Sequence, residues 1–236
     1  MDADLAAVAG LIADPSRAAM LDALTGGVPL TARELGRVAR VAPSTTSEHL
    51  DRLERGGLVV SERRGRTRQV RLAGADVARA IEALAAIAPA KRATGLKAWQ
   101  YGEALRAARS CYDHLAGVAG VALADALVAR RVIEPGDGGF AITSAGDEAL
   151  ARFGLDMAAI RGARRATARA CLDWSERRPH VAGALGAALL GELLDRRWLR
   201  RAGDGRVLTL TPAGASGLES TFGMSLATIG TKSIHP

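Results

Sequence analysis

The chain has 236 residues, which allows one large domain or two small ones. Apolar residues make up 48% and charged residues 24%, so the chain is not too polar to fold, and the aromatic content of 3% predicts a helix-rich core of Ala, Leu and Val. The formal charge is +7, and nearly all of the basic residues are arginine. Arginine binds phosphate well, but charge alone does not establish a nucleic-acid partner.

The cysteine content, the apolar runs and the first residues exclude several classes of protein. Two cysteines, Cys111 and Cys171, do not make a disulfide framework. The longest apolar run, around residues 118–128, is interrupted by Gly120 and Asp125, so we expect no membrane partner. The first residues are acidic and do not resemble a secretory leader, and we therefore expect a cytoplasmic protein.

Helical periodicity dominates the beginning of the chain. A first short helix is expected over residues 5–12, and Asp14 or Ser16 can cap a second. Thr31 begins a third helix, and Glu34 stands three residues later, which is the spacing of a reciprocal capping box. Three short helices are therefore predicted before residue 40.

A fourth helix is predicted after a tight connection at residues 40–42. Ser44 is expected to cap it, Leu50 and Leu53 to face the core, and the Gly56-Gly57 pair to end it. The periodicity then changes from that of a helix to that of a strand.

Residues 58–64 and 67–72 are predicted to form a hairpin around Gly65. Three helices, a tight turn, a further helix and a hairpin are the order of a winged helix-turn-helix. An alanine-rich helix is expected over residues 75–88, broken at Pro89, and helix resumes beyond residue 95.

The remainder of the chain contains an internal repeat. Residues 108–113 match 168–173, residues 115–120 match 181–186, and residues 142–146 match 210–214. Each copy is predicted to be a helix, a second helix rich in small residues, a hairpin and a helix that starts at Thr-x-Ala-Gly. A basic hairpin in the second copy is expected to be a solvated edge; its arginines are Arg196, Arg197, Arg200, Arg201 and Arg206.

The predicted fold class is mainly α with small β-hairpin wings. A winged helix-turn-helix DNA-binding and dimerisation domain covers residues 1–90, and a C-terminal effector or sensor domain covers residues 91–236. The second domain consists of two tandem degenerate winged-helix-like repeats, at about residues 106–160 and 166–225.

The fourth helix and the hairpin tip together predict binding to double-stranded DNA. A helix that begins with hydroxyl side chains and carries an outward basic stripe fits the major groove, and an arginine-rich hairpin suits the phosphate backbone or the minor groove. The DNA-binding residues predicted on the helix are Ser44, Thr45, Thr46, Ser47, His49 and Arg52; those on the hairpin are Arg63, Arg64, Arg66 and Arg68.

These residues carry a resemblance to a known family. The N-terminal part resembles the ArsR family of bacterial winged-helix regulators through residues 14–17, Leu21, Leu24, Leu35, 44–50, Leu53 and 57–59. The resemblance implies a homodimer that binds a palindromic operator, represses transcription and releases DNA when an inducer binds. It places the dimer contacts on residues 5–12 and 75–88, and the half-sites about 10 bp apart.

The chain also departs from that family. The helix at residues 34–39 lacks the cysteine pair of arsenic-sensing members. The helix after the wing has Asp76 but no histidine, whereas zinc-sensing members use both. Neither familiar metal site is available, and more than half of the chain lies beyond the resemblance.

The C-terminal half offers a candidate effector or metal/thiol site, with the inducer left open between a small molecule and a metal. Cysteines and aspartates recur at equivalent positions of the two copies, with His114 beside the first cysteine and His180 in an insertion of the second. Such residues suit zinc or a redox-responsive thiol pair, or they are buried structural thiols and packing aromatics. The candidate residues are Cys111, Asp113, His114, Cys171, Asp173 and Trp174.

Two other classes of function are alternatives to a regulator. The first is a metal- or thiol-dependent enzyme, and the second is a protein-interaction module built on winged-helix units. The chain has no phosphate-binding glycine loop, no Gly-x-Ser-x-Gly elbow and no His-Glu-x-x-His motif. We therefore predict that it is not an enzyme, and the cofactor remains unknown.

Overall fold

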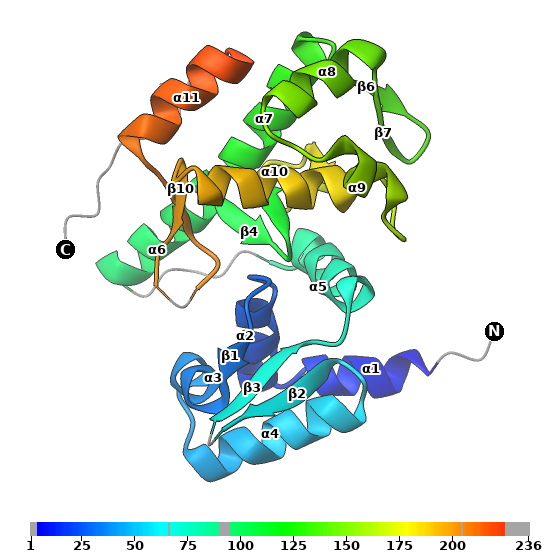
Figure 1. The fold of residues 1–236 in the computed structure, drawn as a ribbon. Coiled ribbons are helices and arrows are strands. Elements are labelled where there is room, and N and C mark those ends of the chain that lie inside the picture. The colour runs from blue at the N-terminus through cyan, green and yellow to red at the C-terminus, as the bar shows by residue number, and fades with distance from the viewer. Residues whose placement is uncertain (1–3, 66, 90–94, 204, 225–236) are drawn as a thin grey trace.

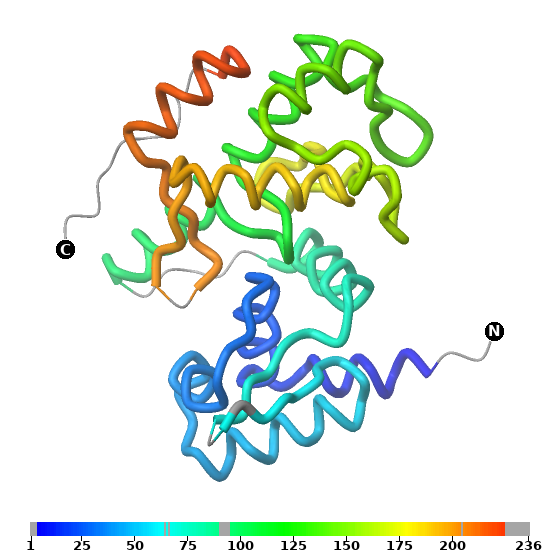
Figure 2. The backbone as a smooth tube through the Cα atoms, viewed as in Figure 1, coloured from blue at the N-terminus to red at the C-terminus, as the bar shows by residue number. Residues whose placement is uncertain are grey.

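The computed structural model describes residues 4–65, 67–89, 95–203 and 205–224. Figure 1 shows the N-terminal elements grouped at one end of the molecule and the C-terminal half at the other, with α5 (Ala75–Ile87) lying between them. The tube in Figure 2 follows the same path and shows the chain leaving the N-terminal group after residue 72 to reach α5.

The N-terminal elements form the predicted winged helix-turn-helix. The strand order in its sheet is β1-β3-β2, and the two longer strands are the antiparallel wing. The bounds are α1 (Leu5–Ile12), α2 (Pro15–Leu24), β1 (Leu30–Thr31), α3 (Ala32–Ala39), α4 (Pro43–Arg55), β2 (Val59–Arg64) and β3 (Thr67–Leu72).

Local capping explains where these helices begin. The Asp14 carboxylate accepts hydrogen bonds from two backbone N–H groups at the start of α2, and Thr31 forms the predicted capping box with Glu34. The prediction that Ser44 caps α4 is wrong. Ala42 is the N-cap, without a side-chain hydrogen bond, and Pro43 occupies the first turn, where its missing N–H costs nothing.

A close approach between α3 and α4 sets the geometry of the helix-turn-helix. A Cβ at Gly36 would lie 2.6 Å from Thr46 Oγ1, so only glycine lets the two helices pack at this distance. Arg40, which ends α3, takes a left-handed conformation and makes the tight turn. Beneath them lies an apolar core that includes Met20, Leu21, Leu24, Leu35, Leu50, Leu53, Val59, Val70 and Leu72.

The C-terminal half contains the element order β-β-α-β-β-α twice. Two helices lie outside that order, α6 (Leu96–Ala107) and α9 (Met157–Gly162). The first occurrence is β4 (Arg109–Cys111), β5 (His114–Ala116), α7 (Val118–Ala129), β6 (Ile133–Gly136), β7 (Gly139–Ile142) and α8 (Ser144–Arg152). The second is β8 (Arg169–Leu172), β9 (Pro179–Ala182), α10 (Gly183–Asp195), β10 (Leu199–Arg201), β11 (Leu208–Leu210) and α11 (Pro212–Phe222).

One part of the repeat prediction is wrong. Residues 108–113 and 168–173 are predicted to open each copy as a helix, but they contain the strands β4 and β8. Each strand pairs antiparallel with the strand that follows it. The two helices predicted at Thr-x-Ala-Gly do begin there, with Thr143 and Thr211 as N-caps. That each of these two segments of the C-terminal half is a winged-helix unit remains a prediction.

The two β-β-α-β-β-α segments, the first and second copies of the predicted repeat, are interleaved. The β6–β7 hairpin of the first copy joins β8–β9 of the second in one sheet, and the β10–β11 hairpin of the second reaches β4 of the first through a bridge between Arg109 and Val207. In the same way α7 packs against β9 and α10 against β5. Each copy therefore completes the other, and neither has a separate core.

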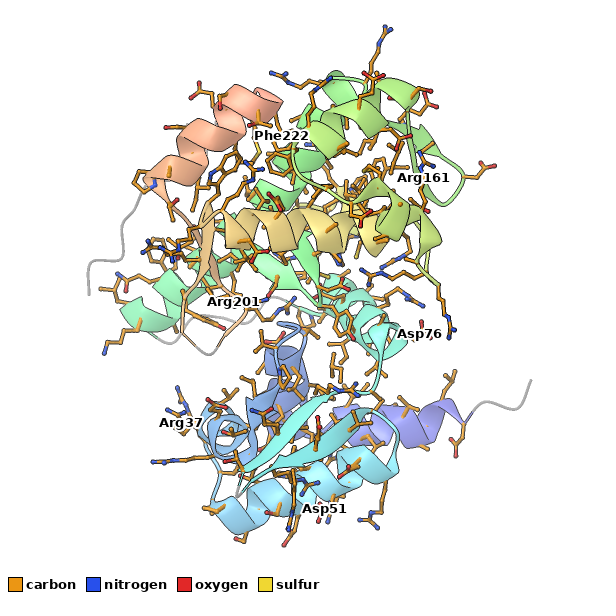
Figure 3. The ribbon with its side chains drawn as sticks, viewed as in Figure 1. Arg37, Asp51, Asp76, Arg161, Arg201 and Phe222 are labelled. Atoms are coloured by element: carbon orange, nitrogen blue, oxygen red, sulfur yellow. The ribbon has the colours of Figure 1, made fainter. Side chains whose placement is uncertain are left out.

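The β4–β5 hairpin also docks on the winged domain. The Tyr112 N–H donates to Thr25 O at 2.6 Å, and the Ser110 hydroxyl donates to Gly26 O at 3.0 Å. Arg201, labelled in Figure 3 at this junction, donates to the same carbonyl at 3.1 Å. Backbone and side-chain hydrogen bonds thus fix one half of the molecule against the loop after α2.

A buried arginine completes the junction and corrects another prediction. Arg206 is predicted on a solvated edge, but it is buried. Its guanidinium pairs with Asp22 of α2 at 2.8 Å and with the buried Glu82 of α5, and its Nε donates to Ser110 O. Helix α2, helix α5 and strand β4, which are distant in the sequence, therefore all contact the Arg206 guanidinium.

Among the described residues, no helix combines the length and the apolar character needed to cross a bilayer.

We predict that Arg206→Ala destabilises the protein strongly, because Glu82 would remain buried without its counter-charge. The expected loss in the free energy of unfolding is about 3–5 kcal/mol. Urea unfolding followed by circular dichroism measures it. Arg200→Ala, which removes an exposed arginine from the neighbouring strand, is the matched control and should change little. Equal losses in both variants would contradict the importance assigned to the Arg206 ion pairs.

Candidate functional site

The outer face of α4 lies at the end of the molecule farthest from the C-terminal half. Figures 1 and 3 show α4 there, with Asp51 projecting outward, and no described part of the C-terminal half covers it. Ser44 and Arg52 are exposed on this helix, as predicted from the helical periodicity, and Ser47 is exposed as well. The helix begins with hydroxyl side chains and presents a basic side chain one to two turns later, the arrangement that the major groove admits.

Two of the predicted DNA-binding residues on α4 face inward instead. Thr46 is buried against Gly36, and its hydroxyl donates to Ala42 O at 2.9 Å, so it is not available to DNA. The His49 side chain is only 12% exposed and lies between Arg17 and Asp14 of the α2 region. Thr45 is half-buried on the flank.

The predicted DNA-binding arginines of the wing also differ in their surroundings. Arg63 is exposed. Arg66 is not among the described residues, and the side chain of Arg64 is not described either. Arg68 does not point from the tip as predicted. Its guanidinium donates to Asp51 Oδ1 at 2.9 Å and to Glu54 Oε2 at 2.6 Å, and so ties the wing to α4.

The environment of Arg68 matches that role. Partial burial alone would lower the pKa of its guanidinium, but the hydrogen bonds to Asp51 and Glu54 outweigh burial and raise that pKa. Its charge is compensated inside the protein, so Arg68 positions the wing instead of neutralising phosphate.

A second candidate site lies inside the C-terminal half. Cys111 and His114 are cross-strand partners in the β4–β5 hairpin, and Cys171 and His180 are cross-strand partners in β8–β9. All four side chains are buried, and their potential ligand atoms lie within 4.8 Å of one another. The structure thus brings together three of the predicted residues and adds His180 as the fourth.

The two predicted aspartates lie next to the Nδ1 atoms of the histidines. Asp113 Oδ1 lies 3.2 Å from His114 Nδ1, and Asp173 Oδ2 lies 3.6 Å from His180 Nδ1. The same Asp173 oxygen accepts hydrogen bonds from Arg109 at 2.9 Å and from the Gly117 N–H at 2.7 Å. Neither carboxylate belongs to the inner group of four.

Trp174, also predicted for this site, lies outside it. Its ring packs against the Arg109 guanidinium, 4.4 Å from the ring centroid. It therefore supports the buried Arg109–Asp173 ion pair, which is a structural role, and does not line the cluster.

The side chains of this site perturb one another's protonation. A hydrogen bond with Cys111, together with the His114 and His180 rings, lowers the pKa of the Cys171 thiol, although burial opposes this. The hydrogen bond with Cys171 and burial raise the pKa of the Cys111 thiol. Burial alone would raise the pKa of the Asp173 carboxyl, but the Arg109 charge and several hydrogen bonds hold that pKa well below its usual range.

The fold and the exposed helix define a winged helix-turn-helix DNA-binding protein. A family model described as a helix-turn-helix domain matches residues 12–62. The HTH-type transcriptional regulator YdfF of Bacillus subtilis (strain 168) is 39% identical over 226 residues, which is 96% of this chain and 100% of that protein. The chain therefore belongs to the HTH-type transcriptional regulators and is a regulator, not an enzyme.

Solved structures match the N-terminal part. A homodimeric winged helix-turn-helix domain of Mb0332 from Mycobacterium bovis, described as a possible ArsR-family regulator, is 31% identical and covers 34% of this chain and 73% of its own, with a TM-score of 0.32. The cadmium sensor CMTR from Mycobacterium tuberculosis is 33% identical and covers 39% of this chain and 95% of its own, also with a TM-score of 0.32.

We predict that Arg68→Ala loosens the wing while leaving the fold intact. Its ion pairs are partly exposed, so the expected loss of stability is about 1 kcal/mol or less. Hydrogen exchange should increase in β2 and β3 and remain unchanged in α7 and α10, as measured by mass spectrometry. Arg63→Ala is the matched control. A similar increase for both variants would show that Arg68 does not brace the wing.

Proposed function

We propose that this regulator is a repressor that binds a palindromic operator as a homodimer and is released by an inducer sensed in the C-terminal half. The observation that carries the proposal is the free outer face of α4, flanked by the β2–β3 wing. The resemblance to the ArsR family supports repression and release.

The exposed side chains suit distinct parts of DNA. Ser44, in the first turn of α4, can donate or accept at base edges. Ser47 is exposed but its hydroxyl donates to Pro43 O at 3.1 Å, so it can accept there. Arg52 is long enough for a guanine edge or a phosphate. Arg63 on the wing suits the backbone beside the groove. The hydroxyls would contribute specificity, and the arginines would contribute most of the salt-dependent affinity.

The dimer surface is proposed on α1 and α5. Each of these helices exposes apolar side chains: Leu5 is 77% exposed, Val8 41%, Leu84 44% and Ile87 79%. Figure 1 shows both helices on the same side of the molecule. Apolar residues gathered in this way favour contact with a second copy, and the two α4 helices would then address half-sites about 10 bp apart.

Arg17 holds α1 in place for such a contact. Its guanidinium donates to Leu11 O at 2.6 Å and to Gly10 O at 2.8 Å, so the last carbonyls of α1 are bonded from α2. The helix therefore has a fixed direction although none of its own residues is buried.

Operator binding is tested with the full chain and a labelled duplex from its own promoter, by fluorescence anisotropy over a range of salt concentrations. We expect Arg52→Ala and Arg63→Ala each to weaken binding. Where the arginine neutralises a phosphate, its removal should also reduce the slope of log K against log salt by about 0.9. Arg152→Ala, on the far helix α8, is the control and should bind normally. Equal affinity for the promoter and for a scrambled duplex would overturn the proposal.

The proposed dimer is tested separately. Ile87→Glu places a charge in the proposed interface, and we expect it to yield a monomer in multi-angle light scattering and to weaken operator binding. Leu172→Glu substitutes another exposed residue, 50% accessible on β8, and should leave the mass unchanged. A wild-type chain that is monomeric at micromolar concentration would contradict the dimer.

A further inference from the structure

We propose that the C-terminal half binds one Zn²⁺ ion in a closed tetrahedral site. Its ligands are Cys111, His114, Cys171 and His180. The site goes beyond the proposed function, because it does not depend on DNA binding, and it uses none of the positions at which the ArsR resemblance would place a metal.

The spacing of the sulfur atoms fits this ion. Zn–S bonds of about 2.3 Å at a tetrahedral angle place two sulfurs about 3.8 Å apart. Cys111 Sγ and Cys171 Sγ lie 4.0 Å apart, so an ion can enter with small side-chain shifts. A disulfide requires an S–S distance of about 2.05 Å, and the hairpins would have to close by a further 2 Å or so to form one.

The two histidines of the cluster have buried ring nitrogens without hydrogen-bond partners. His114 Nε2 and both ring nitrogens of His180 are buried without a hydrogen-bond partner among the described residues. The two rings are stacked with their centroids 5.0 Å apart. A buried polar nitrogen without a partner costs free energy, and a metal bound through Nε2 of each ring would give two of these three nitrogens a partner.

Each histidine has a carboxylate next to its Nδ1, which is the position that carboxylates take behind metal-binding histidines. Asp113 is hydrogen-bonded to His114 Nδ1 and fixes that ring with Nε2 directed away from the carboxylate, whereas Asp173 lies 3.6 Å from His180 Nδ1, which is longer than a hydrogen bond but close enough to form one after a small shift. The arrangement recurs on both hairpins, although Cys111 and His114 are three residues apart and Cys171 and His180 are nine.

Charge also favours a divalent ion. Two thiolates and two neutral imidazoles around Zn²⁺ give a centre without net charge, which can be buried at little desolvation cost. The soft sulfur ligands and the lack of an inner carboxylate disfavour Mg²⁺ and Ca²⁺. Four protein ligands leave no open position, so the site is of the structural type.

The ion would have a route to the site. A cavity of about 370 Å³ lies beside the cluster, lined in part by Cys111, His114 and Cys171 and by the α5 residues Ala75 and Ala78. The site therefore lies close to the boundary with the winged domain. Ser110 and Tyr112, on either side of Cys111, are the residues that bond to the loop after α2.

The first experiment measures metal in the reduced full chain without DNA. We expect about one zinc per chain by plasma mass spectrometry after purification without added chelator. After removal of the zinc, titration with Co²⁺ alone should give the visible bands of a tetrahedral ion and a thiolate-to-cobalt charge-transfer band, with saturation at about one equivalent.

Variants separate the ligands from the rest of the fold. Cys171→Ser should abolish the charge-transfer intensity of one thiolate and release zinc. Asp113→Asn preserves the four ligands, and we expect it to weaken zinc affinity about 10- to 100-fold, as measured by competition with a chromophoric chelator. His49→Gln, which changes the described histidine outside the cluster, is the matched control and should retain full zinc content.

Two results would overturn the site. One is a reduced, folded wild-type chain that binds neither Zn²⁺ nor Co²⁺ under these conditions. The other is full zinc content in Cys171→Ser together with unchanged affinity in Asp113→Asn. Because no step involves DNA, a failure of operator binding would leave these measurements intact, and a failure of metal binding would leave the proposed operator contacts intact.

Discussion

The β4–β5 hairpin is the element on which the arrangement of the molecule depends. On one side its backbone and the Ser110 hydroxyl bond to the loop after α2, at Thr25 and Gly26. On the other side it carries Cys111 and His114 against the β8–β9 hairpin of the C-terminal half. Neither half can shift without breaking hydrogen bonds made by this one hairpin, so the two halves are linked by more than the connecting chain.

Buried charges make this arrangement specific. Arg206 requires both Asp22 and Glu82, and Arg109 requires Asp173, because an unpaired buried charge costs several kcal/mol. Apolar contacts alone would tolerate several packings of alanine-rich helices, whereas these pairs are satisfied in one register only. The scarcity of aromatic residues is thus offset by arginines that join distant segments.

Local signals explain which parts of the sequence could be interpreted. The capping box at Thr31 and the hairpin around Gly65 each depend on neighbours within a few residues, so the winged domain could be predicted almost element by element. Residues 108–113 are mistaken for a helix because short strands of three or four residues have no usable periodicity, and their pairing depends on tertiary contacts. Thr46 shows a different failure: it lies four residues before Leu50 and seven before Leu53, so the helical period already places it on the buried side, and its prediction as a DNA contact followed from its hydroxyl and not from its position. In the cluster, repetition indicates the two cysteines and aspartates, and the sequence also offers His180 in an insertion, but only the strand register opposite Cys171 places His180 in the inner group of four.

The helix α5 connects the two functions that the structure suggests. Its outer side exposes Leu84 and Ile87, whereas its inner side holds Glu82 against Arg206 and contributes Ala78 to the wall of the cavity beside the cluster. A dimer formed through α5 would fix the distance between the two α4 helices, and that distance must match the spacing of the half-sites. Any change in the β4–β5 hairpin or in the Arg206 ion pairs would act on α5 and α2 directly. Operator affinity would therefore respond to events in the C-terminal half through packed elements and ion pairs, without a direct contact between that half and DNA.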